Sequence, residues 1–301
     1  MTGPSTGWVR VVDKERHRLV CLHSREEGHW TDFDDLGAAA DVGVGPCHGQ
    51  VAGARWLPAD ELAIVVGEGS VRVRQPVARP EKIICLGHNF RSHIEEMGRP
   101  IPPHPVLFAK YWRALTGPYD EIVIPPETGM LDWEAELGVV IGRTARHVQE
   151  ADANEYIAGY TVVNDVSARD FQWRTTQFLQ GKTFESTTPV GPAVIRGEAI
   201  DWARDLRIRC CVDGEVVQEA TTADLIFGPS FVIAYLSAIV TLVPGDVIAM
   251  GTPGGVGAGR TPPRYLRPGE VLTTEIEGIG VMRNRITSGG RGRGSPQDMD
   301  H

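Results

Sequence analysis

From about residue 80 onward, hydrophobic residues recur with a period of two or in short continuous runs, and this pattern constrains the fold most. Successive side chains of a strand point to opposite faces, so such runs predict β-strands. Turn sequences such as PGD and RPGE separate them, without regular strand–helix alternation. We therefore expect antiparallel and mixed sheets rather than a doubly wound parallel sheet. The runs are KIICLG, PVLFAK, EIVIP, EAELGVVIG, AGYTVVND, LRIRCCVDGEVV, DVIAMGTP and EVLTTEIEGIG.

Helical spacing is confined to a few segments. Residues 91–97 and 225–236 have it, and residues 150–156 predict a short acidic helix. The expected class is mainly β with some α (α+β).

The chain divides into three parts on composition. Strand-like runs near Trp8, from His17 and from Val71 predict a small β-rich N-terminal domain over residues 1–77. A larger catalytic domain follows over residues 78–287. The tail, 288–301, has too few apolar residues to fold and is expected to be disordered.

The charge balance argues against nucleic acid as the main partner. The 301 residues carry a formal net charge of -9, whereas a nucleic-acid-binding chain usually has a basic excess. Arg291 and Arg293 resemble a Gly-Arg segment, but Asp298 and Asp300 lie close by in the same tail. An anionic substrate would need a local anchor, such as a metal ion with one or two basic side chains.

The cysteines and the apolar segments indicate a cytoplasmic protein without a membrane span. The five cysteines form no CxxC pair, which fits a reducing compartment. The N-terminus lacks the pattern of a secretory signal. The most apolar run, residues 231–243, is too short to cross a bilayer and predicts a buried core helix.

Three acidic residues alternate in the segment LDWEAELGVVIG. In a continuous strand, Asp132, Glu134 and Glu136 would share one face, with Trp133 on the other. Three neighbouring carboxylates repel each other, so they require either full hydration or a cation. A solvated edge strand is the plain alternative. The fully apolar LGVVIG that follows favours a strand entering a core, with the acidic face beside a pocket.

An all-oxygen ligand set indicates a hard divalent ion. Mg²⁺ fits best, with Mn²⁺ and Ca²⁺ as alternatives, and zinc fits less well. Asp165, at the end of another β-run, is a further candidate ligand, although an aspartate there is often a turn or helix cap.

Six ordered motifs together resemble the fumarylacetoacetate hydrolase family across roughly residues 80 to 287. The resemblance implies a mixed β-roll or sandwich catalytic domain. It assigns metal binding to Glu134 and Glu136 of the ExE motif and to Asp165 before the SARD turn. The motifs are LDWEAELGVVIGR, AGYTVVNDVSARDFQ, QGKTFESTTPVGP, TADLIFGPSFVIAYLS, LVPGDVIAMGTPGGVG and LRPGEVLTTEIEGIGVMRNRI.

The same resemblance assigns substrate contacts. Lys182 of QGKTF corresponds to a lysine that neutralises developing negative charge, where the plain reading is a surface lysine. Arg169 and Gln172 of SARDFQ, and Thr252 of GTPGGVG, correspond to positions that contact the substrate's carboxylate or oxo group. An arginine suits a carboxylate because its planar fork donates two parallel hydrogen bonds. A structural ion pair is the alternative for Arg169.

His93 and Glu96 lie three residues apart in RSHIEEMG, so on a helix they share a face. In the family this HxxE orders over bound substrate, and hydrolytic members use it to activate water. A solvated helix face is the plain alternative. With this pair present, the first expectation is C–C hydrolysis of an acylpyruvate-like 1,3-dicarbonyl 2-oxo acid. Decarboxylation of oxaloacetate-like acids and enol–keto isomerisation in aromatic catabolism are alternatives at the same site.

Two further expectations remain open at this stage. The resemblance implies a homodimer, whereas a catalytically silent protein that binds a 2-oxo acid is the alternative from another functional class. Tyr111 and Trp112 follow Lys110, where small rigid residues are usual in the family. If they line the pocket, its shape differs from that of the usual members.

Overall fold

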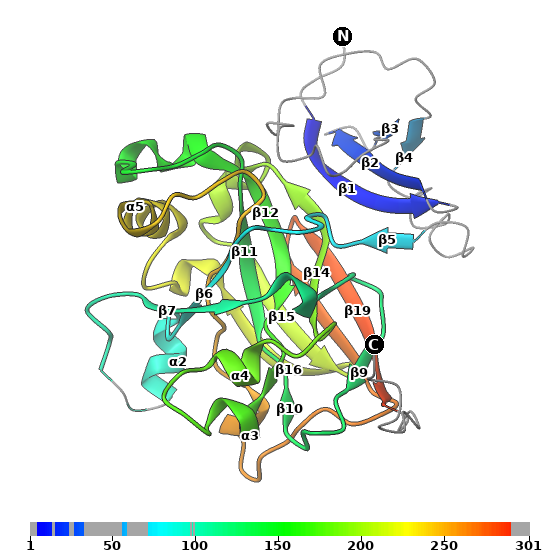
Figure 1. Cartoon of the computed structure of the whole chain (residues 1–301), viewed down its shortest axis with the longest axis vertical. Coiled ribbons are helices and arrows are strands. Elements are labelled where there is room, and N and C mark those ends of the chain that lie inside the picture. The colour runs from blue at the N-terminus through cyan, green and yellow to red at the C-terminus, as the bar shows by residue number, and fades with distance from the viewer. Residues whose placement is uncertain are drawn as a thin grey trace, which may run out of the picture.

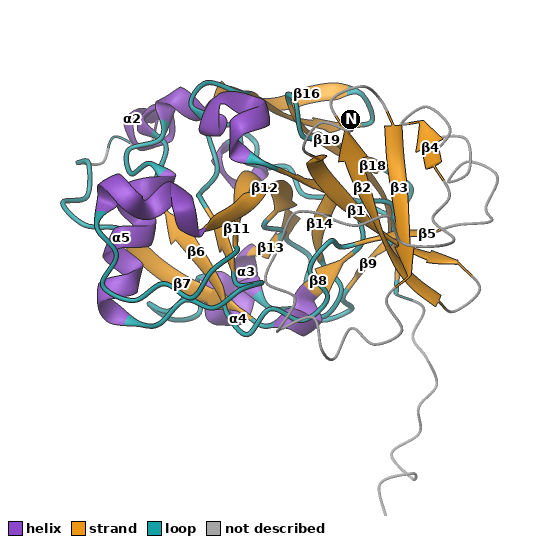
Figure 2. Ribbon diagram, turned by 90° about the horizontal axis from the view of Figure 1, so that it is seen from above, coloured by secondary structure: helices purple, strands orange, loops and turns teal. Residues whose placement is uncertain are grey.

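In a computed structural model of the protein, a long mixed sheet and a five-stranded sheet pack together, with the helices gathered at one side (Figures 1 and 2). The structure describes residues 5–13, 16–23, 27–32, 56–58, 72–96, 98 and 100–289, and side chains within 74–95, 98 and 100–289. This arrangement confirms the mainly β, mixed-sheet expectation.

The long sheet has the strand order β4-β3-β2-β1-β14-β12-β11-β17-β6-β7, while β5 pairs with β1 and β8 with β14. Most neighbours are antiparallel, but β17 pairs with β6, and β14 with β8, in parallel. Its strands are β1 (Ser5–Asp13), β2 (Arg16–His23), β3 (Glu27–Asp32), β4 (Trp56–Pro58), β5 (Arg72–Arg74), β6 (Ile83–Gly87), β7 (Val106–Lys110), β8 (Leu115–Thr116), β11 (Ala135–Ile141), β12 (Ile157–Asn164), β14 (Thr188–Ile195) and β17 (Val247–Ala249).

The second sheet has the order β16-β15-β18-β19-β9, and a short β10–β13 pair lies apart from both sheets. Its strands are β9 (Ile122–Ile124), β15 (Arg207–Val212), β16 (Glu215–Thr221), β18 (Val271–Ile276) and β19 (Gly280–Ser288), and the short pair is β10 (Leu131–Asp132) with β13 (Ser167–Ala168).

The main core lies between the two sheets. Leu137 of β11, Val162 of β12, Ile208 of β15, Leu272 of β18 and Met282 of β19 belong to one buried apolar cluster. All seven residues of β11 are buried, because both faces of this strand are covered. A strand covered on both faces reads as a continuous apolar run, as LGVVIG does.

The helices are short, and most are single turns. The 11-residue helix α5 confirms the core helix expected in the most apolar run, and it ends at Ile239. Residues 150–156 form a 3₁₀ helix. The helices are α2 (Arg91–Glu96), α3 (Arg169–Gln172), α4 (Leu179–Lys182) and α5 (Pro229–Ile239), and the 3₁₀ helices are η1 (Trp112–Ala114), η2 (Glu150–Tyr156), η3 (Gly197–Ala203), η4 (Thr222–Asp224) and η5 (Gly257–Gly259). Among the described residues, no helix has the length and apolar character needed to cross a bilayer.

The N-terminal strands join the long sheet. β1 pairs with β14 through the register Gly7↔Ile195, and β5 pairs with β1 through Arg10↔Arg74. Backbone hydrogen bonding therefore spans the boundary placed near residue 78, which stays a prediction. At the other end, β19 reaches Ser288, and residues 290–301 of the expected disordered tail lie outside the described residues.

Candidate metal and substrate site

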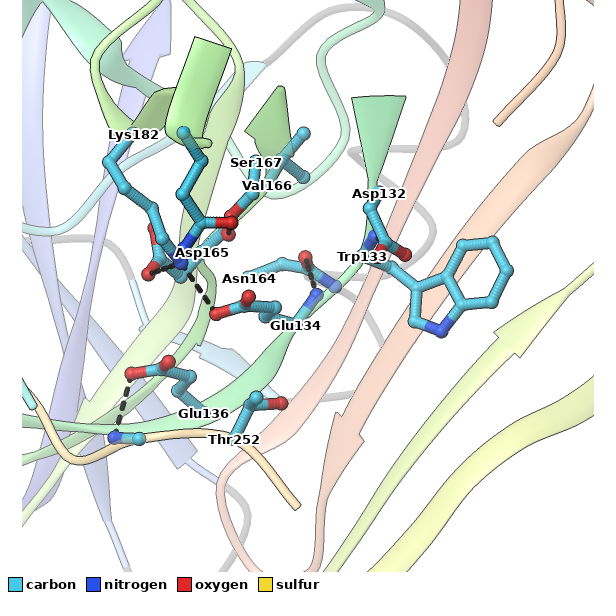
Figure 3. Close-up of polar contacts among 12 residues, drawn as sticks. Asp132, Trp133, Glu134, Glu136, Asn164, Asp165, Val166, Ser167, Lys182 and Thr252 are labelled. Atoms are coloured by element: carbon cyan, nitrogen blue, oxygen red, sulfur yellow. Dashed lines mark hydrogen bonds and ion pairs between the residues drawn. The ribbon is translucent and has the colours of Figure 1, made fainter. Parts of the chain in front are cut away.

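The three carboxylates predicted to bind a metal ion meet on one side of β11, whereas Asp132 does not join them. Glu134, Glu136 and Asp165 are buried and each offers an oxygen within 4.8 Å of the others (Figure 3). Glu134 comes just before β11, Glu136 lies on it, and Asp165 directly follows β12. The pairing Ala135↔Asn164 brings the ends of these strands side by side.

Asp132 does not share the face of Glu134 and Glu136, so the expectation of one continuous acidic strand was wrong. Strand pairing is interrupted at Trp133 and Glu134, between β10 and β11. The Asp132 carboxylate accepts hydrogen bonds from the Gly257 and Ala258 backbone N–H groups at 2.7 and 2.9 Å. It lies apart from the other three carboxylates in Figure 3.

Side-chain amides replace the missing strand partner at this interruption. Asn164 Oδ1 accepts from the Glu134 N–H and Gln218 Oε1 accepts from the Ala135 N–H, both at 2.9 Å. Buried backbone N–H groups require such partners. Asn164 and Gln218 thereby hold the segment that places Glu134.

Three buried cations surround the carboxylates. Lys182 Nζ lies 2.7 Å from both Glu134 Oε2 and Asp165 Oδ2. Lys110 Nζ pairs with Asp165 Oδ1 and also donates to the Val166 carbonyl at 3.3 Å. Arg169 contacts Glu134 Oε1 at 2.6 Å through Nη1 and Asp132 Oδ2 at 2.8 Å through Nε. Opposite charges at these distances allow so many ionised groups to be buried together.

The carboxylates differ in their electrostatic surroundings. Burial opposes ionisation of Glu134, but Lys182 and Arg169 outweigh it and lower the pKa of Glu134 to about 2. Burial, followed by the charges of Asp165 and Glu134, raises the pKa of Glu136 well above its usual range. Among the described residues, no lysine or arginine forms an ion pair with Glu136, which accepts a hydrogen bond from the Gly251 N–H at 2.9 Å. A cation between the three carboxylates would supply that missing positive charge.

Close backbone packing positions Lys182 and the backbone N–H group that donates to Glu136. A Cβ on Gly181 would lie 2.5 Å from the Gln172 nitrogen, so glycine lets α4 approach α3 and brings Lys182 to the cluster. Gly251 has φ +92°, a conformation that favours glycine, and its N–H then points to Glu136.

A cavity of about 450 Å³ opens above the cluster. Several predicted residues line it: His93, Glu134, Arg169, Gln172, Lys182 and Thr252. Arg169 Nη2 is buried and has no hydrogen-bond partner, whereas Gln172 Oε1 accepts from Nη1 at 2.8 Å. The Thr252 hydroxyl is engaged within the protein, donating to the Ala135 carbonyl and accepting from Gln218. The side chain of Glu96 lies outside the described residues, so its pairing with His93 stays a prediction.

Aromatic side chains also line the cavity. Phe108, Trp173 and Phe178 line it, with Phe108 and Phe178 edge to face at 5.7 Å between ring centroids. Tyr111 and Trp112 are not among its lining residues and are 59% and 37% exposed. The Trp112 ring instead contacts two guanidinium groups, with the Cζ atoms of Arg79 and Arg113 at 4.6 and 5.0 Å from its centroid.

Sequence reasoning assigned no role to Lys110, Asn164 and Gln218. One signal was available for Lys110, because a lysine that closes the apolar run VLFAK enters the core with its strand. Asn164 directly precedes Asp165. Nothing local distinguishes Gln218, which reaches Ala135 from the other sheet.

Comparison with known proteins covers most of the chain. Residues 82–287 match the model of the fumarylacetoacetate (FAA) hydrolase C-terminal domain. The human mitochondrial oxaloacetate tautomerase FAHD2A is 43% identical over 224 residues, 74% of this chain and 71% of the relative. The Xenopus laevis mitochondrial oxaloacetate tautomerase fahd2 is 42% identical over 74% of this chain and 70% of its own length.

Solved structures share the fold of this chain. A fumarylacetoacetate hydrolase from psychrophilic Exiguobacterium antarcticum superposes with a TM-score of 0.81 at 32% identity, covering 95% of this chain and 100% of its own. A 2-hydroxyhepta-2,4-diene-1,7-dioate isomerase from Mycobacterium marinum gives 0.76 at 29% identity, with 95% and 100% coverage.

Proposed function

Because the chain belongs to the fumarylacetoacetate hydrolase family, we propose that it is a divalent-metal-dependent enzyme that interconverts the keto and enol forms of a small 2-oxo acid. The observation that carries this proposal is the buried Glu134, Glu136 and Asp165 cluster below a cavity that also holds an unpartnered guanidinium nitrogen of Arg169. Oxaloacetate is the first candidate substrate.

The names of the relatives favour tautomerisation over the hydrolysis expected first. Several relatives that are similar in sequence are called oxaloacetate tautomerases, and some structural neighbours are called isomerases. The neighbour called a hydrolase keeps C–C hydrolysis as the second candidate, because His93 lines the cavity here. Decarboxylation of an oxaloacetate-like acid is the third.

The residues fit a hard divalent ion, since three carboxylates offer oxygens within 4.8 Å of one another. Mg²⁺ is the first choice, and Mn²⁺ and Ca²⁺ are alternatives. Such an ion would act as a Lewis acid on the oxo oxygen and so favour loss of the neighbouring C–H proton.

The protein's own groups would orient the substrate and move the proton. Arg169 is fixed by Asp132 and Gln172, so its Nη2 can donate to the substrate carboxylate. His93 is assigned to carry the proton at the carbon beside the oxo group. Lys182 is assigned to stabilise negative charge on the oxo oxygen, because its side chain lines the cavity and carries a positive charge. The net change is one proton leaving carbon and one arriving at oxygen.

The test follows decay of the oxaloacetate enol by its ultraviolet absorbance. Protein stripped with EDTA should lose activity and recover it with Mg²⁺ or Mn²⁺. Pyruvate formation in the same samples measures decarboxylation, and an acylpyruvate measures hydrolysis. Full activity of the stripped protein would refute the metal requirement. Acylpyruvate cleavage without tautomerisation would favour the hydrolase.

Substitution of His93 tests its proposed role. His93→Asn should lower the tautomerisation rate by about 10²–10⁴ while Mn²⁺ affinity stays unchanged. His147→Asn is the matched control, because His147 is exposed and its φ of 54° is one that asparagine tolerates. Equal rates for both variants would remove His93 from the mechanism.

Assembly and location remain proposals. We expect a homodimer in solution, which light scattering would measure, and a cytoplasmic location. The relatives named above as mitochondrial make cell fractionation the appropriate check.

A further inference from the structure

All four carboxylate oxygens of Glu134 and Asp165 already contact a cation of the protein. Arg169 contacts Glu134 Oε1, Lys110 contacts Asp165 Oδ1, and Lys182 bridges the remaining oxygen of each residue at 2.7 Å. Each of these oxygens has a second lone-pair site, so a metal ion that binds both carboxylates together with Glu136 either shares its oxygens with these cations or displaces one of them. Repulsion between a divalent ion and a cation this close favours displacement. Three cations of the protein are candidates for displacement: Arg169, Lys110 and Lys182.

Arg169 and Lys110 are held by groups outside the metal cluster. Arg169 donates to Asp132 through Nε and to Gln172 through Nη1. Lys110 has a side chain 0% exposed, donates to the Val166 carbonyl and is not among the residues that line the cavity. Displacing either one would break contacts that a metal ion does not replace.

Among the described residues, Lys182 has no hydrogen-bond acceptor outside the cluster, and it reaches the cavity. Its Nζ donates to Glu134 and Asp165, and both acceptors belong to the cluster. The side chain lines the cavity, with Nζ 5.0 Å from the centre of the Phe108 ring. An ammonium that leaves the two carboxylates can therefore enter a space where an aromatic face and a substrate oxygen accept it.

We propose that Lys182 occupies the place of the metal ion in the metal-free protein and turns into the cavity when the ion binds, while Lys110 stays in place as the permanent counter-ion that positions Asp165. The inference rests on the metal site of the proposed function. It makes Lys110 a positioning residue and Lys182 a group that becomes available to substrate only in the metal-loaded protein.

The charge count gives this exchange a consequence for substrate binding. With all four carboxylates ionised, a divalent ion would leave the loaded cluster with one formal positive charge, and the carboxylate of a 2-oxo acid would balance it. Metal and acid should therefore bind cooperatively, each raising the affinity of the other by the same factor. The groups counted are Asp132, Glu134, Glu136 and Asp165 against Lys110, Arg169 and Lys182.

Amine labelling of the unmodified protein tests the exchange directly, because the chain has four lysines: Lys14, Lys82, Lys110 and Lys182. Brief reductive methylation followed by peptide mass spectrometry gives an initial rate for each. Samples contain EDTA, Mg²⁺, or Mg²⁺ with oxalate, a small dianion that can chelate the ion. Lys82 serves as the internal control, since its ion pairs with Glu81 and Asp246 lie outside the cluster.

We expect Mg²⁺ to raise the labelling rate of Lys182 by about tenfold or more, the factor that corresponds to 1.4 kcal/mol. Oxalate should lower that rate again, and the rates of Lys110 and Lys82 should stay constant. A Lys182 rate that Mg²⁺ leaves unchanged or lowers would overturn the inference. So would a Mg²⁺-induced rise at Lys110.

The outcome is separable from that of the proposed function. Calorimetry on the same samples shows whether Mg²⁺ binds, and absence of binding would refute both proposals. A metal-dependent rise at Lys182 without turnover of any enol would uphold the exchange and refute the proposed reaction. Enol turnover that Mg²⁺ restores, with unchanged Lys182 labelling, would uphold the proposed reaction and overturn the exchange.

Discussion

At the scale of single residues, Glu136 stands apart from the other carboxylates of the cluster. Glu134 and Asp165 each contact two cations, whereas Glu136 accepts a backbone hydrogen bond from Gly251. Burial and the charges of Asp165 and Glu134 raise the pKa of Glu136 above its ordinary value of 4.5. In the metal-free protein the carboxyl group therefore keeps its proton at pH values above 4.5. A bound ion would remove that proton and use the carboxylate.

Glu136→Gln should separate metal binding from folding. The folded protein holds a proton that the unfolded chain loses near pH 4.5, so this side chain costs stability as the pH rises above 4.5. Glutamine removes that cost, and metal-free Glu136→Gln should be at least as stable as the original protein at pH 7. Its Mn²⁺ affinity should fall at least about a hundredfold.

Urea unfolding in EDTA and Mn²⁺ titration measure these two effects. Glu155→Gln is the control, because Glu155 is an exposed partner of Arg143. Unchanged Mn²⁺ affinity in Glu136→Gln would remove Glu136 from the ligand set.

Arg169→Lys keeps the charge and removes the fork. The buried Nη2, which has no partner in the protein, is lost, together with the hydrogen bond that it would donate to a substrate carboxylate. A charge-assisted hydrogen bond contributes about 1.5–3 kcal/mol, so KM for the enol should rise roughly tenfold to a hundredfold. Steady-state kinetics measure this, with Arg143→Lys as the exposed control. A lower unfolding temperature with an unaltered KM would show that Arg169 is structural.

At the scale of elements, the interruption between β10 and β11 decides where the acidic side chains point. Strand pairing stops at Trp133 and Glu134. The side-chain oxygens of Asn164 and Gln218 accept hydrogen bonds from the backbone N–H groups of Glu134 and Ala135 in place of a strand partner. Asp132 turns to the backbone of η5, while Glu134 and Glu136 turn to Asp165. The site therefore depends on a side chain delivered by β16 of the other sheet.

Gln218→Leu should destabilise the protein and weaken metal binding together. The Ala135 N–H would be left unsatisfied in the core, at a cost of about 1–3 kcal/mol, and Thr252 would lose its donor. Urea unfolding and Mn²⁺ titration measure the two losses. Glu219→Gln tests the adjacent residue, whose ion pair with Arg209 is exposed and should contribute less than about 1 kcal/mol. Wild-type Mn²⁺ affinity in Gln218→Leu would mean that Glu134 is placed without this bond.

At the scale of the whole molecule, the site lies on β11 and β12 near the middle of the long sheet, with β1 to β5 beyond β14 (Figure 1). The ligand residues and the three cations all follow residue 78. The N-terminal strands instead cover the edge of β14 through the pairing of Gly7 with Ile195.

A chain beginning at residue 78 should therefore keep Mn²⁺ affinity and turnover. Its uncovered β14 presents unpaired backbone groups, which promote association between chains. Light scattering at increasing concentration should show larger particles than for the full chain, while Mn²⁺ titration gives the same affinity. Loss of metal binding in a folded truncated chain would contradict the proposed domain boundary.

Local pattern predicted many of the strands and the helical segments α2, η2 and α5. The β-runs, including the continuous run LGVVIG, correspond to observed strands, because the hydrophobic pattern of a strand reflects which of its faces are buried. The resemblance located the carboxylates that meet in space. Two long strands, β14 and β19, were not among the predicted runs, although β14 contains Pro189 and Pro192, which weaken the strand signal.

The tertiary structure alone decided the electrostatics of the site. Alternation placed Asp132 with Glu134 and Glu136, but the Glu134 and Ala135 N–H groups donate to Asn164 and Gln218 where strand pairing stops, and Asp132 contacts the Gly257 N–H instead. Lys110, Lys182 and Arg169 come from separate elements, and their charges become partners of the carboxylates only when β7, α3 and α4 pack around β11. Sequence distance carries no information about such contacts, because Coulomb interactions depend on separation in space and on burial.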